Sequence, residues 1–388
     1  MSFDLFSWLS ALGWGVIGYI LPFIAVLTVV VFFHELGHFL VARRCGVKIL
    51  TFSIGFGPEL FGFNDRHGTR WKLSAIPLGG YVKFFGDDNV ASTPDQDALA
   101  RMGEGERKQS FVFQSVGRRA AIVVAGPLAN FVLAVVIFAS VFTFFGRQTT
   151  SARVDTVIAG SAAEAAGIRP GDVVVAIDGR PIESFAQMQR IVSTNAGRAL
   201  TITVDRAGVR EELKAVPTLR GFCNGVLGIS KSYAPNDVKL QRVEPLNAVG
   251  LGFEETYFIV ERSLCYLGGV IIGRESADQL GGPARIAQVS GQAWKAGLDS
   301  GGAGGAVVAL FYLAGLLSAS IGFLNLFPVP LLDGGHLLFY AIEASRGRPL
   351  SDRAQEVGFR IGLAIVVMLM IFATYNDIVN IAAQWTAS

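Results

Sequence analysis

The sequence has little charge and few cysteines. Only 16% of its 388 residues are Asp, Glu, Lys or Arg, whereas 51% are hydrophobic. Soluble domains carry about 25% charged residues, so this composition excludes an ordinary soluble protein and indicates a membrane protein. The net charge of +2 and the lack of a long basic run give no support for a nucleic-acid partner.

Cysteine usage excludes two kinds of site. Cys45, Cys223 and Cys265 lie far apart and form no CxxC pair, so the sequence predicts neither a cysteine zinc site nor a disulfide framework. Cys223 and Cys265 could pair if both face an oxidising space. The default expectation is that all three pack as small apolar side chains.

Four apolar segments are each long enough to cross a bilayer, which needs roughly 20 apolar residues. They are 16–42, 116–145, 306–327 and 357–378. A fifth segment, 256–273, carries Glu261 and Arg262 at its centre, so we expect an amphipathic helix on the membrane surface there. The first segment lacks the preceding basic residues of a signal peptide and is expected to be retained.

Basic residues predict the orientation. The first Lys or Arg of the chain is Arg43, and the stretch from there to Arg119 is rich in both. Arg346, Arg348 and Arg353 lie between the last two apolar segments. The positive-inside rule then places both loops in the cytoplasm and both termini outside. The ends of the first and third spans therefore face the same side and can meet.

The outer part of the chain contains a predicted small α+β domain at 151–218. Short strands are expected at 154–158, 173–177 and 200–204, with a helix at 162–166, separated by Gly-rich and Pro-rich turns. This pattern resembles a PDZ domain of the protease-associated bacterial type. Residues 219–305 are predicted to form an amphipathic, interfacial region.

The first apolar segment contains His34-Glu35-Leu36-Gly37-His38, an HExxH motif. On a helix this motif places two imidazoles on one face, where they can share a zinc ion, with the Glu beside the metal-bound water. Two packed histidines are the alternative. Ionisable groups inside a bilayer are costly unless they serve a function, so the zinc interpretation is favoured.

A third ligand is expected because catalytic zinc usually has three protein ligands. The best candidate is Asp333, in the segment Asn325 to His336 at the end of the third span. Pro328 and Pro330 stop the helix there, and Gly334 and Gly335 are expected to permit a tight turn. The alternative is a surface turn in which Asp333 caps a helix.

The cytoplasmic loop is predicted to contain a β-hairpin. Segments 47–63 and 69–85 are rich in Phe, Gly and β-branched residues and continue to Asp87. Such a hairpin can dip to the membrane and accept an extended substrate by edge addition. An ordinary interfacial hairpin explains the same pattern equally well.

Two further polar residues lie in or next to the apolar segments. Asn130 lies in the small-residue segment 125–130 of the second span, and we expect it to hydrogen-bond a neighbouring helix. His336 follows Gly334 and Gly335, and we expect a structural role for it.

Taken together, HELGH, the pattern Asn-x-x-Pro-x-Pro-x-x-Asp-Gly-Gly-His and a PDZ-like domain between spans two and three resemble the site-2 protease family. These M50-type enzymes are intramembrane zinc metalloproteases, and the likeness is greatest to the bacterial regulator of sigma-E protease group. The chain departs from that group's best-known members in having one recognisable PDZ domain, where they have two.

The resemblance implies roles for individual residues. One Zn²⁺ per chain would be held by His34, His38 and Asp333, with Glu35 as the catalytic base. The residues implied to contact substrate are Asn325, Pro328, Pro330, Gly79, Gly80 and Tyr81.

The resemblance also implies a setting and a substrate class. We expect a multi-pass protein of the bacterial inner membrane, with periplasmic termini and PDZ domain and an active site near the cytoplasmic side. Its substrates would be single-span membrane proteins such as anti-sigma factors or leftover signal peptides, trimmed first by another protease. A non-catalytic PDZ scaffold and a metal transporter are the alternatives, but neither needs a Glu between two zinc-binding histidines.

The predicted fold is a polytopic α-helical membrane protein with four transmembrane helices, a cytoplasmic membrane-associated β-hairpin region and a periplasmic PDZ-like α+β domain. Its expected segments are 1–42 (first span), 43–115 (cytoplasmic loop), 116–146 (second span), 151–218 (PDZ domain), 219–305 (interfacial region), 306–336 (third span), 337–356 (cytoplasmic loop) and 357–388 (fourth span and C-terminus).

Overall fold

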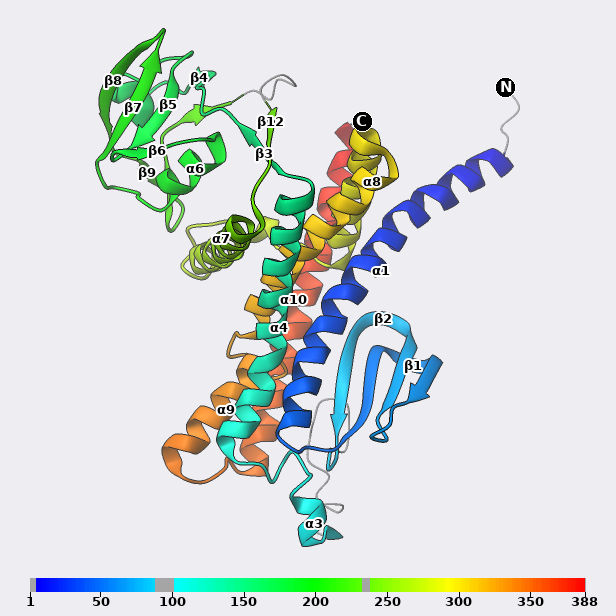
Figure 1. The fold of residues 1–388 in the computed structure, drawn as a ribbon. Helices are drawn as coiled ribbons and strands as arrows, with labels where there is room; N and C mark the ends of the chain where they lie inside the picture. The colour runs from blue at the N-terminus through cyan, green and yellow to red at the C-terminus, as the bar shows by residue number, and fades with distance from the viewer. Residues whose placement is uncertain (1–4, 88–100, 232–237, 388) are drawn as a thin grey trace. The chain divides into compact units, whose positions relative to one another are not determined.

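The structure, a computed structural model, describes residues 5–87, 101–231 and 238–387 (Figure 1). They form two compact units. The larger covers 1–138, 252–259 and 278–388, and the smaller covers 139–251 and 260–277. The parts of the predicted segments that fall on 1–4, 88–100, 232–237 and 388 lie outside the described residues.

The larger unit is built from long helices and one β-hairpin. Its elements are α1 (Leu5–Arg44), β1 (Ile49–Asn64), β2 (Arg70–Phe84), α3 (Glu104–Arg107), most of α4 (Val116–Phe144), part of α7 (Pro245–Ile271), most of η2 (Ala277–Gln279), α8 (Pro283–Asn325), α9 (Asp333–Arg346) and α10 (Asp352–Ala387).

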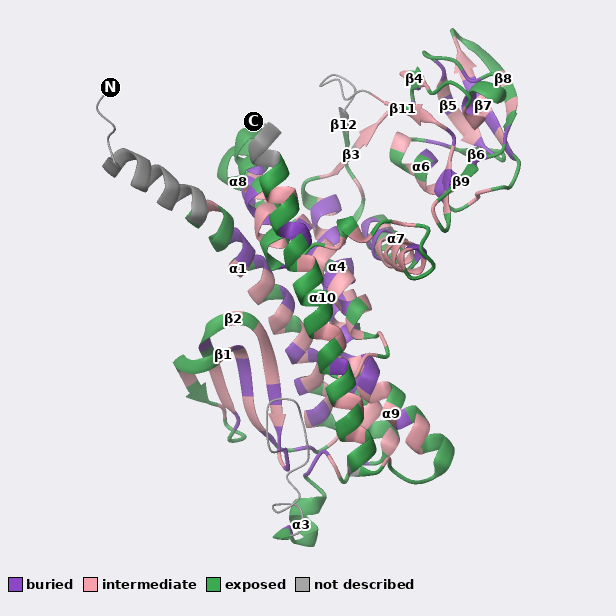
Figure 2. Ribbon diagram, turned by 180° about the vertical axis from the view of Figure 1, so that it is seen from behind, coloured by how far each residue is buried: buried purple, intermediate pink, exposed green. Residues whose placement is uncertain are grey.

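Among the described residues, α1, α4, α8 and α10 are long and apolar enough to cross a membrane. Their number fits the predicted polytopic membrane protein. In the most apolar window of α4, 61% of the residues are buried, against 6% in α10, so α4 is a central helix and α10 a peripheral one. Figure 2 shows the same contrast, with α10 largely exposed along its length.

Small residues bring α1, α4 and α8 close together. A β-carbon on Gly37 of α1 would lie 2.2 Å from the carbonyl oxygen of Ala125 in α4. One on Gly322 of α8 would lie 3.0 Å from the β-carbon of Asn130 in α4. Glycine permits this approach of helix backbones inside a membrane. The three helices therefore meet at the level of the HELGH motif.

Helix α8 differs from the predicted third span. It begins at Pro283, and Gly301 and Gly302 interrupt it with non-helical dihedrals, φ +60° at Gly302. A β-carbon on Gly297 would lie 2.6 Å from the Gly305 carbonyl oxygen, so the two helical parts fold back on one another. Residues 303–325 correspond to the predicted span, whereas 283–300, assigned from sequence to the interfacial region, are helical.

The predicted hairpin is present as β1 and β2, paired antiparallel and strongly curled. Phe52 pairs with both Val82 and Trp71, so the first half of β1 lies between the two halves of β2. Residues 80–82 form an outer edge whose recorded pairing is with β1 alone. The connecting turn is held by Asp65, whose carboxylate accepts hydrogen bonds from the backbone N–H groups of His67 and Thr69.

The smaller unit has the predicted α+β character. Its elements are β3 (Arg147–Thr150), β4 (Thr156–Val157), α5 (Ala162–Ala165), β5 (Val173–Ile177), β6 (Arg180–Pro181), α6 (Phe185–Ser193), β7 (Leu200–Arg206), β8 (Val209–Ala215), β9 (Thr218–Arg220), β10 (Asn224–Val226), β11 (Ile229–Ser230), β12 (Val238–Gln241) and most of α7 (Pro245–Ile271).

Its core and caps follow from the sequence. Val154, Ile202 and Val204 are fully buried in the central cluster, and Ser161 and Ser184 cap α5 and α6. Strand order in the main sheet is β6-β5-β7-β8. Strand β11 pairs with β4, so strand pairing extends beyond residue 218, the predicted end of the domain. The PDZ resemblance itself stays a prediction.

One expectation about cysteine is wrong. Separate packing was the default expectation for Cys223 and Cys265 and their pairing the alternative; the two form a disulfide, with their α-carbons 5.8 Å apart. Their separation of 42 residues along the chain carries no pairing signal, because the fold alone brings α7 beside the loop after β9. Cys45 is the free cysteine.

Candidate active site

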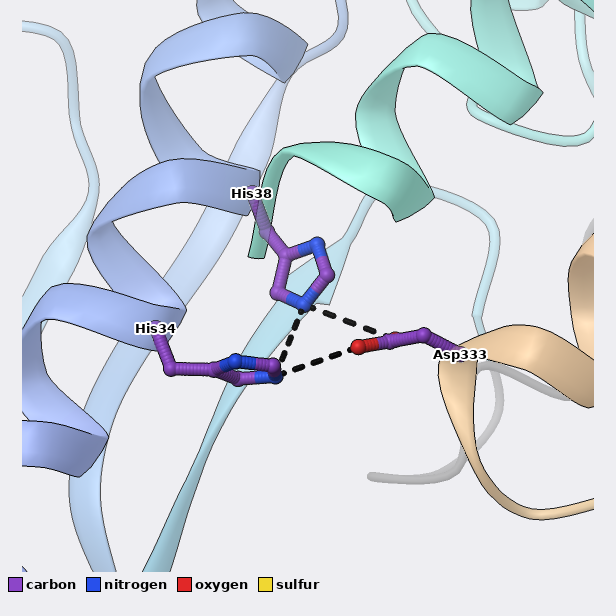
Figure 3. A group of neighbouring side chains, drawn as sticks. All are labelled: His34, His38 and Asp333. Atoms are coloured by element: carbon purple, nitrogen blue, oxygen red, sulfur yellow. Dashed lines mark hydrogen bonds and ion pairs between the residues drawn. The ribbon is translucent and has the colours of Figure 1, made fainter. Parts of the chain in front are cut away.

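The HELGH histidines and Asp333 converge on one point (Figure 3). His34 and His38 project from the same face of α1, and their Nε2 atoms lie 3.3 Å apart. Asp333 reaches them from the start of α9, with Oδ2 3.2 Å from His34 Nε2 and Oδ1 3.5 Å from His38 Nε2. All three ligand atoms lie within 4.8 Å of one another. The structure thus brings together the three predicted metal ligands.

The loop between α8 and α9 sets the position of Asp333. Leu331 has φ +94°, an unusual left-handed conformation for a branched residue and a local strain beside the site. Gly334 and Gly335 lie in the first turn of α9, where β-carbons would come within 2.2 Å of the Phe327 carbonyl oxygen and 2.4 Å of that of Val329. These glycines therefore give room for the loop backbone to pack on α9, rather than forming the expected tight turn.

The donor atoms suit a cation. His38 Nδ1 lies 2.9 Å from the Ile122 carbonyl oxygen, which can only accept, so Nδ1 carries a proton, and in the neutral ring Nε2 then presents a lone pair. Oδ2 of Asp333 is buried and, although it lies 3.2 Å from His34 Nε2, makes no hydrogen bond of good geometry within the described structure. An imidazole lone pair and an unsatisfied carboxylate oxygen meet here, and a divalent metal ion would satisfy both. Nitrogen and oxygen ligands of this kind fit zinc.

Glu35 lies beside this cluster. Its residue is 8% exposed, and a β-carbon on Gly80 of β2 would come within 2.8 Å of its Cγ atom. Glu35, His34, His38 and Asp333 all line one cavity of about 220 Å³. The carboxylate therefore lines the same cavity as the three converging ligand atoms, as a base acting on a metal-bound water requires.

The residues predicted to contact substrate divide into two groups. Asn325, Gly80 and Tyr81 line the cavity, and the Asn325 amide nitrogen lies 3.5 Å from His34 Nε2. The other three are not among the described residues that line it: Pro328 is exposed, Pro330 packs against Gly362 of α10, and Gly79 packs against Phe56.

Several residues of the cavity carry no sequence signal. Phe111, Tyr340 and Phe359 contribute aromatic walls, together with His336, for which a structural role was favoured over a role beside the metal ligands. Single aromatic residues in apolar segments are normal core residues, so nothing in their spacing marks them. Asn130 was predicted to hydrogen-bond a neighbouring helix, and its amide nitrogen lies 3.2 Å from His34 Nδ1 in α1.

The chain is similar in sequence to known proteins over most of its length. The chain matches the model of peptidase family M50 over residues 22–369. It is 49% identical over 369 residues to "Putative zinc metalloprotease Atu1380" of Agrobacterium fabrum, covering 93% of this chain and 96% of that protein. It is 47% identical to "Putative zinc metalloprotease R01501" of Rhizobium meliloti, with the same coverage.

A third relative, "Metalloprotease MmpA" of Caulobacter vibrioides, is 41% identical over 372 residues, covering 91% of this chain and 93% of that protein. The matched region includes the HELGH motif, the β-hairpin and the loop that carries Asp333. The chain belongs to peptidase family M50.

Proposed function

We propose that the protein is an intramembrane zinc endopeptidase that hydrolyses peptide bonds in or near the transmembrane segment of single-span membrane proteins. The convergence of His34, His38 and Asp333 beside Glu35 carries the proposal. Three of these four residues lie in α1, a helix apolar enough to cross a membrane. Metal ligands and a candidate base in such a helix support cleavage of membrane-embedded substrates.

The chain's residues can supply the acid–base chemistry. His34, His38 and Asp333 would hold a zinc ion, which would supply Lewis-acid activation of water and of the scissile carbonyl group. The Glu35 carboxylate takes a proton from the attacking water and returns it to the leaving amine nitrogen. Burial of Glu35 keeps bulk water from competing for this proton.

The edge of β2 is suited to holding the substrate. A transmembrane helix hides its carbonyl groups in i to i−4 hydrogen bonds, so it must unwind before hydrolysis. Gly80 and Tyr81 line the cavity and pair with β1 on one side only. The opposite edge of these residues offers backbone groups to an extended substrate, in the manner of β-strand addition.

Basic residues and the disulfide support an orientation of the chain in the bacterial inner membrane. The stretches that begin at Arg43 and that contain Arg348 are rich in basic residues and are assigned to the cytoplasm. The Cys223–Cys265 disulfide belongs to the segment assigned to the periplasm, an oxidising compartment where disulfides persist. Both termini and the smaller unit are then periplasmic, and the long apolar helices contact the lipid bilayer.

The smaller unit is proposed to act as a PDZ-like filter for substrates trimmed by an earlier protease. Val238 of β12 pairs with Thr150 of β3, so the ends of the intervening segment lie side by side. Replacing 152–236 with a short Gly-Ser linker therefore closes the chain at a natural junction. We expect the deletion to accelerate cleavage of untrimmed substrates. Unchanged discrimination between trimmed and untrimmed substrates would contradict the filter.

Glu35→Gln tests the proposed activity. The variant keeps the three ligand side chains, so we expect bound zinc to remain while cleavage falls by about 100- to 10,000-fold. Trimmed substrates that remain anchored in the membrane (membrane stumps) should accumulate in cells that express the variant. Glu356→Gln, at an exposed position of α10, is the matched control and should leave cleavage unchanged. A scaffold or a metal transporter would be indifferent to Glu35→Gln, so an unchanged stump pattern would contradict the protease.

A further inference from the structure

Asn130 makes the remaining polar contact to the metal-ligand histidines. Its side chain projects from the central helix α4, the residue is fully buried, and its amide nitrogen lies 3.2 Å from His34 Nδ1. The other nitrogen of the same ring, Nε2, is directed at Asp333. Asn130 therefore contacts the side of the imidazole that faces away from the metal-ligand cluster.

The chemistry of imidazole determines what this contact must do. A neutral ring has one N–H donor and one lone pair, and a metal needs the lone pair. For His38, the Ile122 carbonyl oxygen accepts from Nδ1 and leaves Nε2 free. His34 needs an equivalent acceptor for its own Nδ1–H. Within the described structure, Asn130 is the residue whose side chain lies within hydrogen-bond distance of that atom.

The Asn130 amide can provide that acceptor by rotation. Its oxygen, Oδ1, is buried and has no hydrogen-bond partner in the described structure. The nitrogen and oxygen of an Asn amide occupy equivalent positions, so a half-turn about χ2 places Oδ1 beside His34 Nδ1. In one orientation the amide donates to a ring protonated on Nε2. In the other it accepts from a ring protonated on Nδ1, whose Nε2 can bind metal.

The surroundings keep Asn130 in place for this task. The Ser318 hydroxyl of α8 donates a 2.8 Å hydrogen bond to the Asn130 carbonyl oxygen. Gly322, one helical turn further along α8, leaves room for the Asn130 β-carbon, since a side chain there would begin 3.0 Å away. Helix α8 thus holds the backbone of Asn130 beside His34, with the side-chain amide directed at the His34 ring.

We infer that Asn130 is a positioning residue that selects the metal-binding tautomer of His34, with its amide oxygen accepting the Nδ1–H hydrogen bond when zinc is bound. It touches no reacting atom. Such outer hydrogen bonds to metal-ligating histidines typically change metal affinity about 10- to 100-fold. The inference rests on the proposed zinc site and adds a residue to it.

Zinc affinity of the full-length protein in detergent, measured by competition with a chromophoric chelator, tests the inference. Asn130→Leu has a similar volume but no acceptor, and should bind zinc about 10- to 100-fold more weakly. Asn130→Asp supplies a stronger acceptor and should bind at least as tightly as the wild type. Asn380→Leu removes an amide that hydrogen-bonds within α10, away from the site, and should bind like the wild type.

The outcomes separate the inference from the proposed function. If the wild type binds no zinc, the proposed function fails. If the wild type, Asn380→Leu and Asn130→Leu bind zinc equally, only the role of Asn130 is overturned. Should Asn130→Leu not fold, Asn130→Asp decides: wild-type or tighter binding supports the inference, and binding weakened tenfold or more overturns it. The ¹⁵N shifts of His34 in the zinc-bound wild type add a second readout, since protonation on Nε2 would contradict the inference.

Discussion

Gly126 and His38 are so close that no side chain fits between them. A β-carbon on Gly126 of α4 would lie 2.2 Å from Nε2 of His38, the atom that faces Asp333. We therefore expect Gly126→Ala to displace the His38 ring. A displacement of about 1 Å at a reacting centre can lower the rate by about 100-fold. Zinc affinity and cleavage should fall together, as measured by chelator competition and by turnover of a membrane substrate.

The matched control lies in the same helix. A β-carbon on Gly117 would meet nothing within 4 Å, and Gly117→Ala replaces a poor helix former with a good one. It should leave zinc binding and cleavage at wild-type levels. Normal zinc binding by Gly126→Ala would mean that α4 can move away from α1 without cost, which would contradict the close packing described here.

The general fold was predictable because its signals are strong and local. Long apolar runs predicted the four long helices, and two segments rich in Phe, Gly and β-branched residues predicted the hairpin. The meeting of His34, His38 and Asp333 was predictable because both segments end on the same predicted side of the membrane. The residue types at these positions have few structural roles inside a bilayer, so their chemistry indicated the site directly.

The remaining features depend on contacts that sequence does not encode locally. The fold-back of α8 at Gly302 requires that Gly297 and Gly305 pack together. The Cys223–Cys265 disulfide requires the folded chain to bring distant residues together. Gly334 does not form a turn. Its lack of a side chain lets the backbone of Phe327 pack against it. In each case the deciding partner is distant in sequence or its approach has no pattern.

An ion pair holds α9, and with it Asp333, against α4. Arg119 Nη2 lies 2.6 Å from Glu343 Oε1, both side chains are 14% exposed, and the guanidinium also packs over the Tyr340 ring. Removing one partner leaves the other enclosed without its counter-charge. We expect Glu343→Gln to destabilise the protein by about 3 kcal/mol and to weaken zinc binding. Thermal unfolding in detergent and chelator competition measure the two effects.

An exposed ion pair supplies the control. Arg360 and Glu356 of α10 have the same 2.6 Å separation, but their side chains are 77% and 61% exposed. Glu356→Gln should change stability by less than about 1 kcal/mol. The reversed pair Arg119→Glu with Glu343→Arg should recover part of the stability lost in either single change. No loss in the single variants would show that α9 is held by its other contacts.

The first turn of α8 is capped by a residue from α10. Asp377 is 2% exposed, and its two carboxylate oxygens accept hydrogen bonds from the backbone N–H groups of Gly282 and Arg285 at 3.0 and 2.9 Å. A helix N-terminus gains from such acceptors and from negative charge. Asp377→Ala should lower stability by about 1 to 2 kcal/mol. Asp377→Asn, which keeps one acceptor, should cost less, and equal unfolding midpoints for all three proteins would contradict the cap.

The β1–β2 turn should stay intact well into the acid range. Burial alone would raise the pKa of Asp65, but hydrogen bonds from the Thr69 N–H, the Arg43 guanidinium and the His67 N–H outweigh it and lower the pKa from 3.8 to about 2. A depressed carboxylate pKa gives stability that is full above the unfolded value of 3.8 and is lost as the pH falls through about 2. The Thr69 amide should therefore be equally protected from hydrogen exchange at pH 7 and at pH 5, after correction for intrinsic rates.

Asp65→Asn should reduce that protection already at pH 7, because it removes the charge that pairs with Arg43. Loss of protection in the wild type between pH 7 and pH 5 would mean that another group, with a higher pKa, holds the turn.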